Sequence, residues 1–166
     1  MKIKNRMHRT VIISNHVTIK FPRLLSPWKR LKYFFTKRRE VAWIEIRTMI
    51  RTFLEGFREN LNEFLCWREN KAAFLMPVYF CIGIIEIQKT SHLKEISEDE
   101  IDQIWVSLIK LAKQEVWDTD HHNLASPANY HKEGNQFKLI DYGGQGMRQF
   151  IRKYRQELEK IFSSQT

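Results

Sequence analysis

The sequence predicts an α+β fold in which a small antiparallel sheet is combined with helices. Two pairs of β-rich segments predict hairpins, one from residues 10–13 with 17–21 and one from 73–78 with 83–88. Apolar residues recur with helical spacing between residues 41 and 69 and again between 97 and 112. With 166 residues, the chain is long enough for a single domain with a core of its own.

Composition and charge indicate a globular protein with a basic end. The chain is 43% hydrophobic and 28% charged, which excludes a disordered polymer. Residues 1–39 hold twelve Lys and Arg and no acidic residue, which gives this segment a charge of +12. Because the net charge of the chain is +9, residues 40–166 carry a net charge of −3. This distribution favours an anionic partner or ligand at the basic end, although a solvated basic face explains it equally well.

The cysteines and the lack of long apolar runs indicate an intracellular location. Cys66 and Cys81 lie in apolar surroundings without metal-ligand spacing, so we expect two reduced thiols in the core. No run reaches the roughly 18 apolar residues of a membrane-spanning helix. We therefore expect a cytoplasmic protein, with its basic end a candidate for contact with the inner face of the membrane.

The first hairpin places one lysine among apolar strand residues. In the second strand Val17, Ile19 and Phe21 share one face, while Thr18 and Lys20 share the other. A strand lysine can bind phosphate, but from the hairpin alone a solvent-facing lysine is the expectation. Residues 22–39 then interleave aromatic with basic side chains, a pattern that suits an anionic surface, nucleic acid or, more commonly, packing on the protein's own core.

The helical segments have recognisable limits. Gly56 is expected to end or bend the first helix, so that residues 58–69 form a second piece. Residues 97–100, Ser-Glu-Asp-Glu, are a capping box that opens the next helix. A final amphipathic helix is expected after Gly146.

A carboxylate at a strand end is the main candidate for cation binding. Residues 137–140 predict a short buried strand, Asp141 follows it, and Gly143-Gly144 lets the chain turn away. The run from 117 to 130 supplies further oxygen and nitrogen ligands of the kind that suit Mg²⁺, with a transition-metal site as a minor alternative. These ligands are Asp118, Asp120, His121, His122, Asn123 and Asn129.

The order of these elements resembles the protein-kinase-like fold, as found in small bacterial and phage kinases and in lipopolysaccharide-core sugar kinases. Residues 17–20, Val-Thr-Ile-Lys, are similar to the strand motif that ends in a phosphate-binding lysine. Asp141-Tyr142-Gly143 is similar to the metal-binding Asp-Phe-Gly element. The resemblance implies ATP and Mg²⁺ as cofactors, with Lys20 on the phosphates and Asp141 on the metal.

The resemblance also implies partners for these two residues. Glu63 is the preferred helix glutamate to hold Lys20, with Glu45 as the alternative. Residues 86–88, Glu-Ile-Gln, would form the hinge whose backbone contacts adenine, which makes Glu86 and Gln88 candidate nucleotide-binding residues.

The catalytic loop fits this resemblance in two registers. In the preferred one, Asp118 accepts the proton of the acceptor hydroxyl and Asn123, five residues later, holds metal. In the other, Asn129 holds metal and the position five residues earlier is Leu124, so the base is lost.

The chain departs from the family pattern at both ends. No glycine precedes residue 56, so a Gly-rich phosphate loop is missing, and residues 1–9 read as a basic tail in place of a first strand. Residues 10–90 would form an N-lobe-like part and residues 91–166 a reduced C-lobe-like part of one minimal kinase-like domain. Only 25 residues follow Asp141, too few for a peptide-binding platform.

These observations lead to one expected activity and two alternatives. We expect an ATP-dependent phosphotransferase that acts on a hydroxyl of a small or anionic acceptor, such as a sugar or lipid, or of a protein. The first alternative is a catalytically inactive kinase-like scaffold, a pseudokinase. The second is a basic module that binds nucleic acid or a membrane surface through residues 1–39.

Overall fold

The computed structural model describes residues 1–6, 8–23, 39–90, 94–95, 98–112, 129–133, 136–144 and 146–163. Its strands are β1 (Lys2–Asn5), β2 (Arg9–Ile13), β3 (Val17–Pro22), β4 (Val78–Cys81), β5 (Glu86–Lys89), β6 (Lys94–Glu95), β7 (Tyr130–Glu133) and β8 (Gln136–Leu139). Its helices are α2 (Arg39–Asn70), α3 (Glu98–Ala112), α5 (Met147–Lys153) and α6 (Arg155–Ser163). The α+β class expected from the sequence is confirmed.

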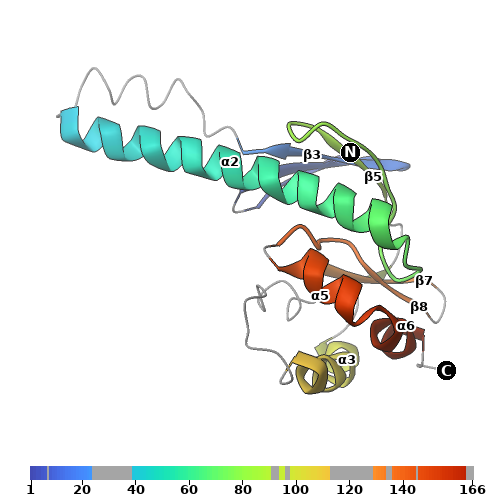
Figure 1. Ribbon diagram of the computed structural model, residues 1–166. Coiled ribbons are helices and arrows are strands. Elements are labelled where there is room, and N and C mark those ends of the chain that lie inside the picture. Colours follow the sequence, from blue (N-terminus) through green and yellow to red (C-terminus); the bar gives the residue numbers. More distant parts are fainter. Residues whose placement is uncertain are drawn as a thin grey trace.

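The long helix α2 separates two groups of elements (Figure 1). On one side lies an antiparallel five-stranded sheet with the order β1-β2-β3-β5-β4. On the other side lie α5, α6, α3 and the strands β7 and β8, which belong to a three-stranded sheet with the order β6-β7-β8. The first half of α2 extends beyond both groups. Within the described residues no helix is long and apolar enough to cross a membrane.

The first hairpin forms as expected, but its buried face is the polar one. In β3, Thr18 and Lys20 are buried, whereas Val17, Ile19 and Phe21 are partly exposed. Lys20 is only 4% exposed, so the expectation of a solvent-facing lysine is wrong. It fails because α2 and the strand end after β8 cover this face and supply partners for the ammonium group.

The expected basic tail is partly a strand. Residues 2–5 form β1 and pair with β2 in the register Lys2 to Ile13 and Asn5 to Thr10. An edge strand needs a pairing neighbour more than a buried face, and in β1 only Lys4 is partly buried. The sheet therefore begins before Thr10.

Helix α2 continues through Gly56 without ending there. A Cβ at this position would lie 2.9 Å from the Cα of Pro22 and closer still to the carbonyl oxygen of His8. The glycine therefore allows the ends of β2 and β3 to approach the helix backbone. The expected division into two helices is wrong because this glycine serves close packing rather than helix termination.

The second hairpin is shifted along the chain. Its first strand begins at Val78, not at Ala73, and pairs with β5. The preceding residues hydrogen-bond to β8 instead: the Leu139 N–H donates to the Phe74 carbonyl (2.7 Å) and the Met76 N–H donates to the Leu139 carbonyl (2.9 Å). This bridge ties the chain after α2 to the strand that precedes Asp141.

The C-terminal elements build the apolar core. Strand β8 agrees with the expected strand, and the final amphipathic segment forms two helices that break at Tyr154, whose φ of −107° and ψ of 26° lie outside the helical range. The helix expected after the capping box begins at Glu98, and its cap residue Ser97 lies outside the described residues. Buried core residues include Phe74, Leu108, Phe137, Leu139, Met147, Ile151, Leu158 and Phe162.

The two cysteines are free thiols. Cys66 is fully buried in the core, and burial together with the nearby Glu63 raises its pKa to about 12. Cys81 is only partly buried, and partial burial raises the pKa of its thiol as well. Both groups are therefore protonated and unreactive at neutral pH.

Candidate functional site

The site is built around an ion pair between the first hairpin and α2. Lys20 Nζ lies 2.6 Å from Glu63 Oε1, and the side chain of Glu63 is completely buried. The register of β3 with β5 places Glu86 directly opposite Lys20, and its Oε1 lies 3.2 Å from the same ammonium group. A buried lysine is thus held between two carboxyl groups.

A second buried cation, Arg9, shares Glu63 with Lys20. Arg9 Nη1 lies 2.5 Å from Glu63 Oε2, and Arg9 Nε lies 3.1 Å from Glu59 Oε2. Its remaining nitrogen, Nη2, donates a hydrogen bond to Asp141 Oδ1. The guanidinium group therefore connects two carboxylates of α2 with the carboxylate that follows β8.

Backbone contacts bring Asp141 to this cluster. Lys20 Nζ donates to the carbonyl oxygen of Ile140 at 3.1 Å, and the N–H of Tyr142 donates to Glu63 Oε1 at 3.3 Å. The Tyr142 hydroxyl donates to the Met76 carbonyl at 2.6 Å, which anchors the turn in the core. A Cβ at Gly143 would collide with the backbone of Glu59, so glycine permits this close approach to α2.

The electrostatics keep three of these groups, Lys20, Arg9 and Asp141, ionised. Burial alone would lower the pKa of Lys20, but the carboxylates of Glu63 and Glu86 raise it above its usual value. Burial would likewise raise the pKa of Asp141, but Arg9 and then Lys20 lower it. Burial would also lower the pKa of Arg9, but Asp141 and then Glu63 raise it above its usual value. Lys20, Arg9, Asp141 and Glu63 form an interlocked set of charges.

Glu86 is the exception in this cluster. Burial, followed by repulsion from Glu63, raises its pKa to about 8. Neither of its carboxyl oxygens has a hydrogen-bond partner in the described part of the chain, although Lys20 is near one of them. Glu86 therefore retains its proton over most of the neutral range, which leaves Glu63 as the main counter-ion of Lys20.

The structure brings together four of the residues singled out from the sequence. Lys20, Glu63, Glu86 and Asp141 converge, and Glu63 rather than Glu45 is the helix glutamate that contacts Lys20. Asn129 is buried, and its carbonyl accepts a hydrogen bond of 2.8 Å from the N–H of Ile140, next to Asp141. Asp118 and Asn123, the preferred catalytic-loop residues, lie outside the described residues, as do Asp120, His121 and His122.

The expected hinge at residues 86–88 is wrong in its geometry. These residues form β5, which pairs with β3 on one side and β4 on the other. Their backbone groups are used within the sheet, so they do not offer an edge to a nucleobase. The side chain of Gln88 is buried and lies 3.5 Å from the carbonyl of Met76.

Sequence reasoning missed Arg9 because it was assigned to a tail. The available signal was the alternation of β2, since Arg9, Val11 and Ile13 fall on the same side of the strand. In the register of the hairpin Val11 pairs with Lys20 and Ile13 pairs with Thr18, so this side of β2 lies on the same face of the sheet as these two buried residues. An arginine on the same face as two buried strand residues is itself expected to be buried, and a buried charge needs an oppositely charged partner such as a carboxylate.

The basic end of the chain is less available for external partners than its charge indicates. Arg9 and Lys20, two of the twelve basic residues before position 40, are buried in ion pairs. Five more lie in residues 24–38, outside the described residues. A surface that binds nucleic acid or membrane at this end stays a prediction.

A small cavity of about 80 Å³ lies beside Lys20 and Asp141. Basic side chains, apolar strand residues and His131 line it, and the cluster closes one end. Lys20, with Asp141 nearby, suits a phosphate group and its cation, but protein sites for whole small molecules measure roughly 300–1,000 Å³. This space is too small for a whole nucleotide. The described residues contain no group of three or more His, Cys, Asp or Glu placed to hold a metal ion.

Comparisons with models of protein families, with curated proteins and with solved structures each returned no match for this chain. The assignment of the site therefore depends on its geometry and on the chemistry of its residues.

Proposed function

We propose that this protein is a phosphotransferase of the protein-kinase-like type, which uses Lys20 and Asp141 to bind Mg²⁺-ATP for transfer to a hydroxyl acceptor. The observation that carries the proposal is the buried pair of Lys20 and Glu63 beside Asp141. These residues come from the first hairpin, from the helix between the hairpins and from a strand-end Asp-Tyr-Gly, as the family resemblance implies.

Each residue has a separate task in this proposal. Glu63 holds the ammonium group of Lys20 in place, and Lys20 neutralises phosphate charge. In the preferred register Asp141 and Asn123 are the candidates to hold the metal ion and Asp118 orients the acceptor hydroxyl; in the other register Asn129 takes the place of Asn123 and this base is lost. Bound ATP supplies the phosphoryl group. Because the Arg9 guanidinium contacts Asp141, it must move aside before the carboxylate can coordinate a cation.

The proposal is tested by thermal unfolding with ATP, with and without Mg²⁺. A ligand present at ~100 times its dissociation constant adds ~2.7 kcal/mol to the free energy of unfolding. We expect this stabilisation in the native protein and its loss in Lys20→Met. The exposed variant Lys160→Met is the control, because α6 does not contribute to the cavity. No stabilisation of the native protein at millimolar ATP excludes a functional nucleotide site.

A second candidate, a kinase-like scaffold without catalysis, is favoured by the Arg9–Asp141 ion pair. An arginine neutralises the carboxylate that would otherwise bind metal, and the adjoining cavity measures only about 80 Å³. On this alternative the cluster stabilises the fold and the surface binds a partner. Asp141→Asn separates the two: loss of phosphoryl transfer in a folded protein supports the enzyme. If neither the native protein nor the variant transfers phosphate, the scaffold is supported.

A further inference from the structure

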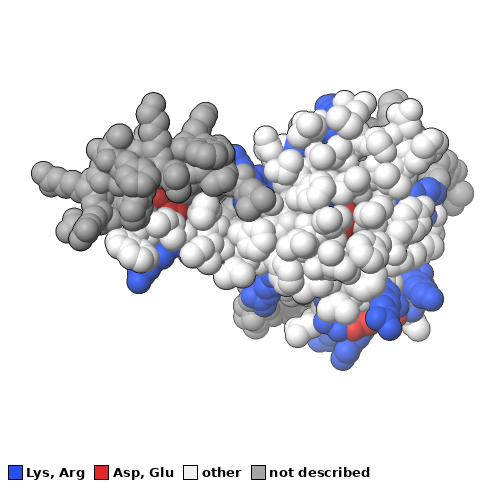
Figure 2. Space-filling view, turned by 90° about the horizontal axis from the view of Figure 1, so that it is seen from above, with Lys and Arg blue, Asp and Glu red and all other residues white. Residues whose placement is uncertain are grey.

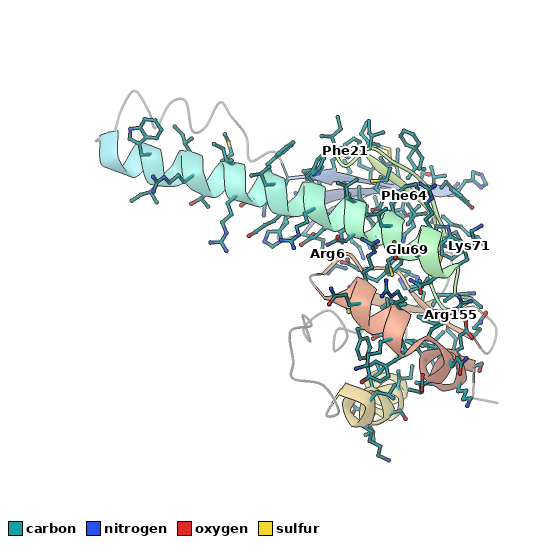
Figure 3. All side chains as sticks on the ribbon, viewed as in Figure 1. Arg6, Phe21, Phe64, Glu69, Lys71 and Arg155 are labelled. Carbon is teal, nitrogen blue, oxygen red and sulfur yellow. The ribbon has the colours of Figure 1, made fainter. Side chains whose placement is uncertain are left out.

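A larger cavity, here called the α2–α5 groove, lies beside the Asp-Tyr-Gly turn. It has a volume of about 880 Å³. One wall is the last part of α2 and the other is α5, which packs against it (Figure 1). Figure 3 marks Glu69 at the end of α2 where the helix faces α5. Its lining residues are Arg58, Asn62, Glu69, Gly144, Gly146, Arg148, Gln149, Arg152 and Lys153.

The groove is strongly basic. Among the described residues that line it, Arg58, Arg148, Arg152 and Lys153 are cations and Glu69 is the one acid. Glu69 is engaged with Arg148: Arg148 Nε donates to Glu69 Oε2 at 2.8 Å, and Arg148 Nη2 donates to the other oxygen. This two-point contact fixes Arg148 in the wall and cancels one charge. Three positive charges remain.

Two of these arginines face the groove from opposite elements. Arg58 comes from α2 and Arg152 from α5, and both are exposed. Neither has an ion-pair partner within the part of the chain that the structure describes. Figure 2 shows Lys and Arg side chains gathered along one edge of the molecule with few acidic ones among them. A concavity with guanidinium groups on both walls and an excess of positive charge among its described lining residues attracts anions.

The floor of the groove is backbone and amide. Gly144 and Gly146 line it, and Gly146 adopts a φ of 81°, which favours glycine. Asn62 and Gln149 add side-chain amides. Asn62 also donates to the Gly143 carbonyl at 3.4 Å, which fixes its orientation beside the turn.

The groove continues toward the ion-pair cluster. A neighbouring pocket of about 200 Å³ shares Arg58, Asn62 and Gly144 with it and reaches Glu59, which contacts Arg9. A molecule with its anionic group among the arginines could thus extend toward the turn that carries Asp141. Among the described residues, the groove and the cavity at Lys20 have no lining residue in common.

We propose that the α2–α5 groove binds a small phosphate-bearing molecule through Arg58, Arg148 and Arg152. The volume matches that of small-molecule sites, which measure roughly 300–1,000 Å³. Arginine is suited to phosphate because its planar donors form two parallel hydrogen bonds to phosphate oxygens. The role of this molecule as the phosphoryl acceptor rests on the proposed function, whereas the anion site itself does not.

The test measures binding of glycerol 3-phosphate and, as an uncharged reference, glycerol, by titration calorimetry. The double variant Arg58→Gln/Arg152→Gln should weaken binding of glycerol 3-phosphate by about tenfold or more, since hydrogen bonds to charged groups dominate such sites. The matched control is Arg155→Gln/Lys160→Gln, which removes two exposed charges of α6 outside the groove and should leave binding unchanged. Circular dichroism checks that both variants are folded.

A second arm distinguishes a soluble ester from a lipid headgroup. Vesicles of phosphatidylcholine with and without phosphatidic acid are tested by co-sedimentation with the same variants. Binding of the soluble ester, or of phosphatidic acid vesicles alone, supports the site when only the groove variant loses it. Absence of binding in both arms, or equal weakening by the two double variants, overturns the proposal.

The Lys20→Met variant separates this inference from the proposed function. If the nucleotide proposal fails, ATP does not stabilise the native protein, yet glycerol 3-phosphate still binds in an Arg58- and Arg152-dependent manner. If the groove proposal fails, ATP stabilisation is retained in the groove variant and phosphate binding shows no dependence on these arginines. Weakening of glycerol 3-phosphate binding by Lys20→Met assigns the anion to the other cavity and overturns the groove site.

Discussion

Arg9 in the second strand forms an ion pair with Asp141, although 132 positions separate them in the chain. Arg9 is 4% exposed and the Asp141 side chain 20%, so the contact lies at the edge of the interior. It joins the five-stranded sheet to the turn after β8. Glu63 contacts both parts, because its carboxylate accepts hydrogen bonds from Arg9 and from the N–H of Tyr142. The cluster therefore couples the two groups of elements on either side of α2.

A double-mutant cycle should detect this coupling. We expect Arg9→Gln and Asp141→Asn each to destabilise the protein, because each leaves a charged partner inside the fold. The double variant should lose less free energy of unfolding than the two single variants lose together, and the difference, the coupling free energy, should be about 1–3 kcal/mol. Urea unfolding of the four proteins measures it. Strict additivity would mean that the two side chains do not interact in solution.

Neutralising Glu63 should be the most damaging single change in the cluster. Glu63→Gln leaves both Lys20 and Arg9 without their common anion, and Glu63 is completely buried. Removing one partner of a buried ion pair typically costs about 3–5 kcal/mol. Urea unfolding should show this loss for Glu63→Gln and little change for Glu159→Gln, which breaks the exposed pair with Arg155. A stability equal to that of the native protein would contradict the buried ion pairs.

Glu86 should make the protein less stable as the pH rises through neutrality. The pKa of Glu86 is raised from 4.5 to about 8 in the folded protein. Between these values the unfolded chain releases a proton that the folded protein retains, so increasing pH favours unfolding. Below the unfolded pKa both states are protonated and the effect is absent.

The comparison with Glu86→Gln isolates this contribution. The native protein should lose about 1.4 kcal/mol relative to the variant for each pH unit crossed between roughly pH 5 and pH 8. Chemical unfolding at several pH values measures the difference. Parallel stability curves for the two proteins would show that Glu86 titrates normally.

Gly56→Ala should destabilise the protein although alanine is the better helix former. Propensity alone favours the substitution by about 1 kcal/mol. The added Cβ would lie 2.9 Å from the Cα of Pro22, against backbone that cannot turn aside, and such overpacking costs about 1–3 kcal/mol. Thr48→Ala, at an exposed position of the same helix, is the control and should have little effect. A gain in stability at position 56 would place the hairpin further from α2.

Local patterns were sufficient for much of the fold. The alternation in the first hairpin, the strand before Asp141 and the helical spacing after Val41 each predict the element that forms. These patterns succeed because each is read within a few residues of the chain. The errors at Gly56 and at residues 86–88 have the opposite origin, since both depend on which backbone lies alongside.

The candidate site shows the same division. The types of Lys20, Glu63 and Asp141 and their positions in a strand, a helix and a strand end could be read from the sequence. The participation of Arg9 could not, because a charge on a strand is assigned to solvent unless its partner is known. The α2–α5 groove was likewise beyond prediction, since its walls come from helices about 80 residues apart that meet only through packing.

The sequence by itself determined the first hairpin, the strand before Asp141, the basic N-terminal end and the candidate residues on these elements. The tertiary structure decided which of these charges are buried, which carboxylate neutralises which cation and which helices line the α2–α5 groove. The reason is physical: propensity and periodicity act between neighbours in the chain, whereas desolvation and ion pairing depend on distances across the folded molecule.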